Sequence, residues 1–441
     1  MTQPNHFRTC LLIVLGVVSA ACQTVAVTPT ASPSPSSTPP PPTPIPPIRV
    51  ISYHLSPGSA PGEWRVVGLI ENQGQVTFGR VELGISLIDT AGKTIAGSST
   101  GALMSNLLPG EASPFSLTLE AATAPAEARV EPLAFEAADG PPGGHQRAEL
   151  ISELEEFFIT GSGELAVLGF VTNPGRSSVS LESLSFLGRG PDGIEKLVAA
   201  MQFGPNRLAP GETAPFMALA PENPGAVQWT PYHDGVVAEP PSAGALEIRG
   251  DPQLHLTAQG APFVVGTLAN SGTTASTGYV LVSLLHGSRL IGLWEIEIPR
   301  PLQAGEQLAF TAFGFPGVNL RFDARDASAI RVDTRVEESL AGQTKTPVVL
   351  AVDVSAFHSV GSAIFIRGTM RNSTEVDVEA ARVYAEVRSS LGELVTAGWS
   401  SAESLEPDGS TVFVLNLPIP VGMDATLAEY DLRAIGQEIQ P

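Results

Sequence analysis

Four short apolar stretches of this 441-residue chain end in the same pattern, Gly-x-x-x-Asn. The four copies are Gly68 to Asn72, Gly169 to Asn173, Gly266 to Asn270 and Gly368 to Asn372. Their glycines lie 101, 97 and 102 residues apart, which is too long for a solenoid repeat and suits a complete small β domain. The recurrence therefore predicts about four tandem domains of one architecture.

A second pattern follows each copy at a nearly constant distance. It is a Pro-Gly-Glu turn, or a variant of it, placed shortly before a phenylalanine. The four phenylalanines are Phe115, Phe216, Phe310 and Phe413. They follow the repeated glycines by 47, 47, 44 and 45 residues, so two separate patterns keep register through all four copies.

The first copy has the residue pattern of a β sandwich. Residues 65–70 are mostly apolar and form a strand candidate, and Asn72 to Gly74 supply the turn that ends it. Residues 81–87 alternate between apolar and small or polar side chains, as in a strand with one buried face. Short strands between Gly, Pro, Asn and Asp turns predict tandem immunoglobulin-like sandwiches, without the Cys and Trp marks of antibody domains. The predicted sandwiches span 49–138, 149–249, 250–338 and 348–438.

Only one segment has a candidate helical pattern. Residues 147–158 are acidic and short, and we interpret them as a linker helix that leads into the second copy.

The first copy resembles the bacterial FxLYD domain, an extracytoplasmic β-sandwich module common in lipoproteins. Leu87 and Asp89 fit the motif that names the family, whereas Ile85 and Ile88 stand where Phe and Tyr are expected. Later copies depart further, and His286 replaces the Asp in the third. The resemblance implies a β-sandwich fold and an extracytoplasmic location, and it implies no particular activity.

The N-terminus has the order of a signal peptide over residues 1–21. Arg8 precedes an apolar run, and small residues then lead to Cys22. This order resembles a bacterial lipobox, in which the Cys thiol receives a diacylglyceryl group, although Ser19 departs from the usual Leu or Val. Ordinary cleavage after Ala21 is the alternative. We expect lipid attachment at Cys22 and a location in the cell envelope, on the outer face of the cytoplasmic membrane or in an outer membrane, or secretion if Cys22 carries no lipid.

A tether is predicted over residues 22–48. Most of it consists of Pro, Ser, Thr and Ala, a composition that favours extended polyproline II and cannot bury a core. At about 3.1 Å per residue, some 20 residues give a spacer on the order of 60 Å. We expect this disordered segment to lift the domains clear of the membrane.

The charge of the chain disfavours one class of partner. With 45 acidic and 24 basic residues, the net charge is −21, which repels the phosphates of nucleic acids. We therefore expect no nucleic-acid partner.

Catalytic patterns are incomplete. Residues 97–101 satisfy Gly-x-Ser-x-Gly, but no helix pattern follows the central Ser99, as the hydrolase turn requires. Residues 92–94 match only the end of a phosphate loop, because Leu87 stands where its first Gly is needed. We predict no enzymatic activity, no catalytic residues and no cofactor.

Metal-ligand patterns are also absent. The seven histidines, 6, 54, 145, 233, 255, 286 and 358, include no His-x-x-x-His pair. Asp323, Asp326 and Asp333 are interleaved with Arg321, Arg325 and Arg331, and calcium sites exclude such competing cations. We predict no metal site.

One segment is a candidate for ligand contact, namely Trp229, Tyr232 and Asp234 in a Pro-rich stretch. Exposed aromatics beside an acid could stack on a sugar or bind a partner protein. The alternative, which we prefer, is that Trp229 and Tyr232 cover the bottom of a sandwich core.

Two functions fit these patterns. The first is a non-enzymatic surface lipoprotein whose tandem modules serve as a spacer or interaction platform, held at the membrane by its N-terminal lipid. The second is an extracytoplasmic binding protein for cell-wall polysaccharide or another specific ligand. Either implies a protein or polysaccharide partner in the cell envelope.

Overall fold

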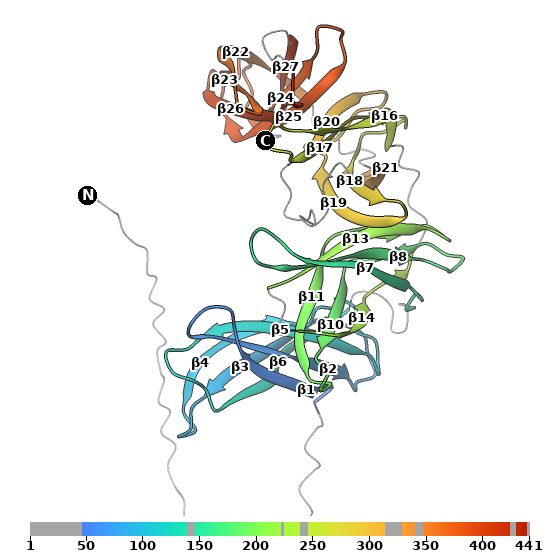
Figure 1. Ribbon diagram of the computed structural model, residues 1–441, viewed down its shortest axis with the longest axis vertical. Coiled ribbons are helices and arrows are strands. Elements are labelled where there is room, and N and C mark those ends of the chain that lie inside the picture. The colour runs from blue at the N-terminus through green and yellow to red at the C-terminus, as the bar shows by residue number, and fades with distance from the viewer. Residues whose placement is uncertain are drawn as a thin grey trace, which may run out of the picture. The chain divides into compact units, whose positions relative to one another are not determined.

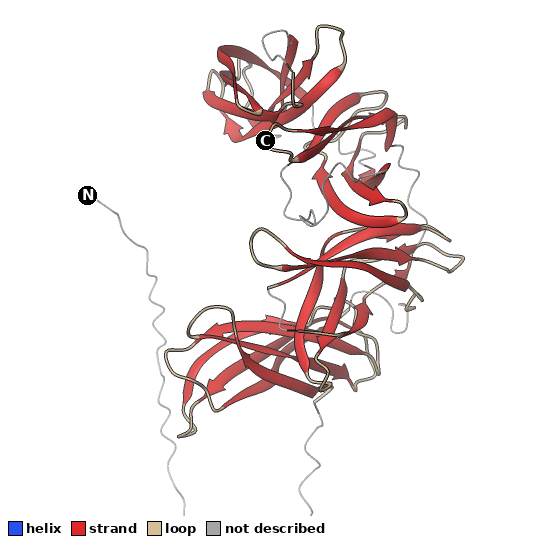
Figure 2. Ribbon diagram, viewed as in Figure 1, coloured by secondary structure: helices blue, strands red, loops and turns tan. Residues whose placement is uncertain are grey.

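The computed structural model describes residues 46–138, 146–221, 225–238, 246–313, 329–339, 347–423 and 429–438. These residues belong to one compact unit and form strands joined by turns, with no helix among them (Figure 2). The predicted all-β class is therefore confirmed. The predicted signal peptide, Cys22 and the tether up to residue 45 lie outside the described residues.

The first group of strands forms two three-stranded sheets, β1-β2-β5 and β4-β3-β6 (Figure 1). Their bounds are β1 (Ile48–Pro57), β2 (Glu63–Asn72), β3 (Phe78–Ile88), β4 (Thr94–Gly101), β5 (Ala112–Glu120) and β6 (Glu127–Ala137). The apolar residues of the alternating segment, Val81, Leu83, Ile85 and Leu87, are all buried in the core of this group. Alternation in the sequence thus places one face of β3 in the core.

The second group contains a six-stranded sheet, β14-β10-β11-β13-β8-β7, and a small sheet, β12-β9-β15. The strands are β7 (Ile151–Ile159), β8 (Leu165–Thr172), β9 (Val179–Ser180), β10 (Leu184–Arg189), β11 (Glu195–Phe203), β12 (Arg207–Leu208), β13 (Thr213–Ala220), β14 (Gln228–His233) and β15 (Val236–Val237).

The third group repeats the two-sheet plan of the first, with sheets β16-β17-β20 and β19-β18-β21. Its strands are β16 (Leu246–Leu256), β17 (Pro262–Asn270), β18 (Ser276–His286), β19 (Arg289–Glu297), β20 (Gln307–Phe313) and β21 (Ala329–Ser339).

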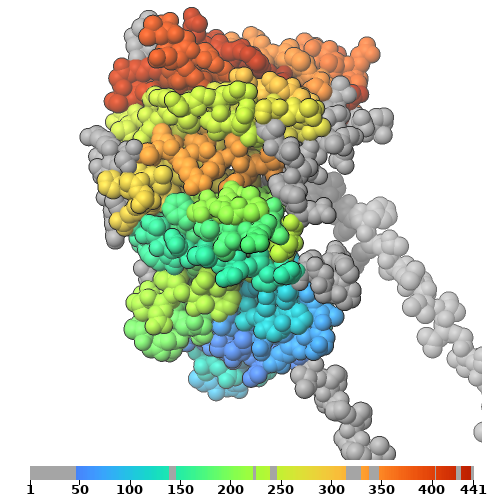
Figure 3. Space-filling view, turned by 90° about the vertical axis from the view of Figure 1, so that its right-hand side faces the viewer, coloured from blue at the N-terminus to red at the C-terminus, as the bar shows by residue number. Residues whose placement is uncertain are grey.

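The fourth group has the order β25-β24-β27-β22-β23-β26 and appears in orange and red at the top of the space-filling view (Figure 3). It is built from β22 (Pro347–Val360), β23 (Ala363–Arg371), β24 (Val378–Arg388), β25 (Leu394–Leu405), β26 (Ser410–Pro418) and β27 (Glu429–Glu438). The long strand β22 pairs with β27 through its first residues and with β23 through the rest, so it contributes to both layers.

The helix predicted over residues 147–158 is wrong. Residues from Ile151 onward form β7, which pairs antiparallel with β8. The apolar and aromatic residues Phe157, Phe158 and Ile159 favour a strand, and Phe158 is buried. Glutamates made the segment look helical, but the pairing with β8 overrides that local preference.

Each group has its own buried apolar cluster, as expected for a succession of sandwiches. The predicted boundary between 249 and 250 falls inside β16. The division of the chain into four separate domains stays a prediction.

The two sequence patterns meet in one cross-strand pair. In every group the repeated glycine lies directly opposite the repeated phenylalanine, as Gly68 lies opposite Phe115. A Cβ atom added to Gly266 would come within 2.5 Å of the Phe310 ring. The glycine therefore leaves the space that the phenylalanine ring fills, which explains why both keep register.

The repeated asparagine joins the end of its strand, the turn that follows and a distant loop, and this junction recurs in all four groups. All four asparagine side chains are buried. The Asn72 side-chain amide donates to the carbonyl oxygens of Val76 and Leu107, at 2.8 and 2.9 Å, and its oxygen accepts from Gly74 N. Equivalent bonds form at Asn173, Asn270 and Asn372. Each asparagine thus fixes the turn after its strand and a distant loop with one side chain.

The Pro-Gly-Glu turn needs a left-handed backbone at one position. Gly110 has φ 81°, and Glu111 caps the turn by accepting from Leu108 N at 3.0 Å. In the looser fourth copy the left-handed residue is Asp408, with φ 60°. Glycine adopts this conformation without steric cost, and Asp is among the few other residues that tolerate it.

Replacement of Asn72 tests the junction. We expect Asn72→Ala to lower the local unfolding free energy of β2 and β5 by about 1 to 3 kcal/mol, because a buried amide loses its hydrogen bonds. Asn72→Asp should destabilise at least as much at neutral pH, since a carboxylate would face the two carbonyl oxygens.

Hydrogen exchange resolved by segment provides the measurement, because a chain of this length need not unfold in one transition. The exposed neighbour Gln73 is the control, and Gln73→Ala should stay within about 0.5 kcal/mol of the parent protein. Equal protection in Asn72→Ala and Gln73→Ala would contradict the assigned role of Asn72.

Candidate functional site

The two aromatic residues predicted as ligand contacts pack against apolar clusters. Trp229 and Tyr232 both belong to β14 and both are half-buried. Trp229 packs on the core of the second group, with its ring 5.4 Å from that of Phe157. Tyr232 packs against the apolar cluster of Val67, Leu69, Leu187 and Val198 that joins the first and second groups. The location agrees with a covering role, and contact with a ligand stays a prediction.

Asp234 is almost fully buried, and both of its carboxylate oxygens accept hydrogen bonds. One oxygen accepts from the backbone amides of Glu182 and Ser183, at 2.9 and 2.8 Å. The other accepts from the Ser105 hydroxyl, at 3.0 Å, across the contact between the first two groups. The neighbouring His233 has its pKa lowered by burial and by the positive charge of Arg147. Asp234 thus acts as a structural acceptor.

Arg147 is the main charged residue of this first contact. Its guanidinium donates to Glu111, the turn glutamate of the first group, with an Nε to Oε1 distance of 2.9 Å. It also donates to the carbonyl oxygens of Asn106 and Gly235. Although burial raises the pKa of Glu111, the hydrogen bonds from Arg147 and Leu108 N lower it overall. The glutamate is therefore held ionised.

The second and third groups meet through a further apolar cluster. It contains Phe158, Ala166, Leu168 and Met217 from one side, and Tyr279, Leu281, Leu290 and Leu293 from the other. The Tyr279 hydroxyl donates to the Gly204 carbonyl at 2.9 Å and accepts from Asn206 N at 3.0 Å. Arg289 forms an ion pair with the buried Glu156 beside this cluster. The contact combines apolar burial with satisfied polar groups.

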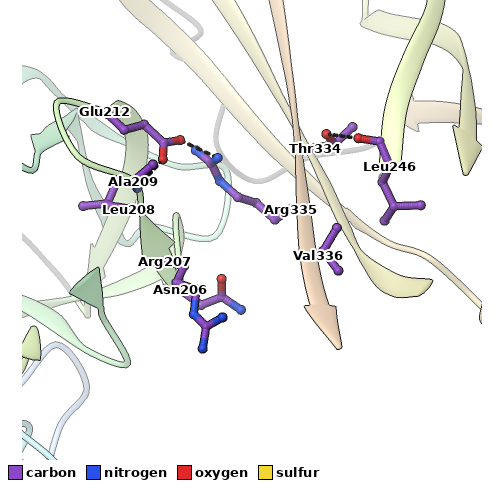
Figure 4. A pocket seen from close by; sticks show the side chains of 9 residues that line it. All are labelled: Asn206, Arg207, Leu208, Ala209, Glu212, Leu246, Thr334, Arg335 and Val336. Carbon is purple, nitrogen blue, oxygen red and sulfur yellow. Dashed lines mark hydrogen bonds and ion pairs between the residues drawn. The ribbon is translucent and has the colours of Figure 1, made fainter. Parts of the chain in front are cut away.

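A cavity of about 170 Å³ opens beside this contact (Figure 4). It is lined by Asn206, Arg207, Leu208, Ala209, Glu212, Leu246, Thr334, Arg335 and Val336. Arg335 pairs with the turn glutamate Glu212 at 2.5 Å, and Thr334 donates to the Leu246 carbonyl at 2.8 Å. Among the described residues, Arg207 has no side-chain partner. The cavity therefore offers one uncompensated cation beside an amide and apolar groups.

The third and fourth groups meet around Tyr384, which packs into the third core. The Arg300 guanidinium lies 5.4 Å from the centre of the Tyr384 ring and pairs with the turn glutamate Glu306. Burial raises the pKa of Tyr384 to about 12, against the lowering effect of Arg300 and Arg382. The phenol is therefore neutral at physiological pH.

The catalytic and metal-binding patterns considered in the sequence are dispersed on strands. Ser99 lies in β4 opposite Gly84, and the corresponding position in the fourth group is Trp399 of β25, opposite Tyr384. Asp333 pairs with Arg331 in β21, at 2.8 Å. Asp323, Asp326, Arg321, Arg325, His6 and His145 lie outside the described residues.

The other histidines occupy five different strands, namely β1, β14, β16, β18 and β22. Within the described ranges, no group of three or more His, Cys, Asp or Glu residues could hold a metal ion. The same ranges contain no helix long and apolar enough to cross a membrane.

Sequence reasoning missed the arginines at the contacts, Arg147, Arg207, Arg300 and Arg335. They belong to no local motif. Arg147 and Arg335 pair with glutamates far away in the chain, Arg300 pairs with Glu306 six residues further on, and Arg207 has no ion-pair partner among the described residues. The turn glutamates were the available signal, since Glu111, Glu212 and Glu306 occupy the same place in three copies and each pairs with an arginine.

No protein-family model matches the sequence, and no curated protein matches it. Among solved structures, the chain has some similarity to the native conformation of E. coli alpha-2-macroglobulin, at 10% sequence identity and a TM-score of 0.12. The match covers 84% of this chain and 27% of that chain, so this chain spans about a quarter of that protein. A TM-score this low supports no conclusion about fold or function.

Proposed function

We propose that this protein is a non-enzymatic lipoprotein of the bacterial cell envelope, related to the FxLYD-domain proteins. Its tandem β-sandwich modules act as a spacer and interaction platform on a Pro-rich tether attached at Cys22. The proposal is supported by the signal-like N-terminus, the lipobox-like cysteine and the repeated buried junction.

The observation that carries the proposal is the way successive strand groups are joined. Each contact buries apolar side chains from both groups, and at the first two contacts an arginine pairs with the turn glutamate of the preceding group. If either partner of such a partly buried ion pair moves away, the other charge is left unpaired, and this lowers stability. Such joints suit a protein that holds interaction surfaces at fixed places along a chain.

Replacement of Cys22 tests the membrane anchor. In a bacterial host supplied with a labelled fatty acid, the full chain should incorporate label and fractionate with membranes. Cys22→Ser should lose the label and shift to the soluble extracytoplasmic or medium fraction, because no other anchor is proposed.

Cys10→Ser is the matched control, since Cys10 lies in the segment removed with the signal peptide, and it should behave like the parent chain. Equal labelling and membrane fractionation of Cys22→Ser and the parent would contradict lipid attachment at Cys22.

A second candidate function is binding of an acidic cell-wall polysaccharide, and the cavity between the second and third groups favours it. A volume of about 170 Å³ accommodates part of a small sugar. Arg207, which has no ion-pair partner among the described residues, offers a guanidinium suited to a carboxylate or phosphate. The opposite pair, Arg335 and Glu212, would confine the ligand on its other side.

A panel of purified wall polymers tests this candidate. We expect Arg207→Ala to weaken binding of an acidic polymer by about tenfold, the effect of one charge-assisted hydrogen bond. Arg176→Ala, an exposed arginine in the same group, should leave affinity unchanged. Absence of binding to every polymer, or equal losses in the two variants, would contradict this function.

A further inference from the structure

In each of the first three groups, one outward sheet face is covered by the next group. The described residues of the fourth group leave the same face uncovered. The residue immediately before the repeated glycine points out of its sandwich. It is Val67, Leu168 or Val265 in the first three groups, and each is at most 2% exposed. In the fourth group the same position is Arg367, which is exposed.

The next group covers this face in each of the first three. Val67 packs against Leu187 and Val198 of the second group, and Leu168 against Leu281 and Leu293 of the third. The face of β17 and β20 contacts β25 of the fourth group, where Ala397 N donates to the Thr311 hydroxyl at 2.8 Å. The face is therefore a docking surface within the chain.

No described strand group covers the same face of the fourth group. Val412 and Val414 point outward from β26, at 58% and 55% exposure. Val412 lies opposite Thr369 and Val414 opposite Arg367, so one apolar pair adjoins one cation. Asp353, also exposed, lies opposite Thr369 on the other side, in β22. Among the described residues, neither Arg367 nor Asp353 forms an ion pair.

We propose that this face, defined by Asp353, Arg367, Val412 and Val414, joins two copies of the chain in a symmetric dimer. The inference is separate from the proposed function, and it holds whether or not Cys22 carries lipid. The equivalent face is already used for docking three times within the chain. A second copy fits this face because, among the described residues, its one cation and its one anion have no ion-pair partner, so that the face is complementary to itself.

Sheet geometry makes the arrangement specific. Strands lie about 4.8 Å apart, and residues on one face of a strand about 6.8 Å apart. A two-fold axis in the plane of the face can place Arg367 of each copy opposite Asp353 of the other. With these spacings, such an axis passes beside Val412. The two Val412 side chains meet near this axis, and Val414 meets the exposed Ala351 of the second copy. The two ion pairs would lie on opposite sides of the axis, next to these apolar contacts.

Sedimentation of the full chain in mild detergent tests the dimer, over roughly 5 to 500 μM because a small interface associates weakly. We expect a reversible monomer–dimer equilibrium. Arg367→Asp and Asp353→Arg should each weaken it at least tenfold, because each places like charges opposite one another. The double variant carrying both changes should restore the affinity of the parent, since each ion pair is re-formed with its signs exchanged.

Valine variants provide the matched control. Val414→Lys should weaken the dimer, whereas Val227→Lys, at a valine 61% exposed in the second group, should not. Thermal unfolding of each variant verifies that these exposed substitutions leave the chain folded. A parent chain that stays monomeric throughout, a dimer insensitive to the single variants, or a double variant that fails to recover would each overturn the proposal.

Discussion

A buried asparagine amide is the interaction on which each strand group depends. Its two N–H donors and one oxygen connect the end of one strand, the turn that follows it and a loop some 35 residues further on, as from Asn72 to Leu107. Buried polar groups must be paired, so the segments it joins cannot separate without cost. The opposing glycine and phenylalanine then fill the core beneath it. What repeats in the sequence is this scaffold.

Differences between the groups appear on the faces that meet. The turn glutamate pairs with an arginine in three groups, and that arginine comes from the following linker, the following group or the same group. The outward position before the repeated glycine is apolar three times and Arg367 once. Surface residues outside the scaffold are free to vary, because they affect stability little. They are therefore the places where specificity toward partners can arise.

The sequence predicted the class and the local elements well, because alternation and turn residues act over a few positions. The alternating strand around Leu83 and the turn before Phe115 lie where they were expected. The helix prediction over residues 147–158 was wrong because the glutamates hid the pattern of a strand. Residues 151–159 pair with β8, and this pairing decides their conformation. The contacts of Arg147 and Tyr279 could not be predicted, since they join residues far apart in sequence. Trp229 was found, but its packing on Phe157 depends on the completed fold.

A double-mutant cycle at Gly266 and Phe310 tests most directly whether the two repeated patterns form one contact. The atoms that an added Cβ at Gly266 would meet most closely all belong to the Phe310 ring. Gly266→Ala alone should destabilise the third group by about 1 to 3 kcal/mol through overpacking. Combined with Phe310→Leu, which removes the ring, it should cost less, giving a coupling energy of about 1 kcal/mol or more by segment-resolved hydrogen exchange. Additive losses would contradict the account.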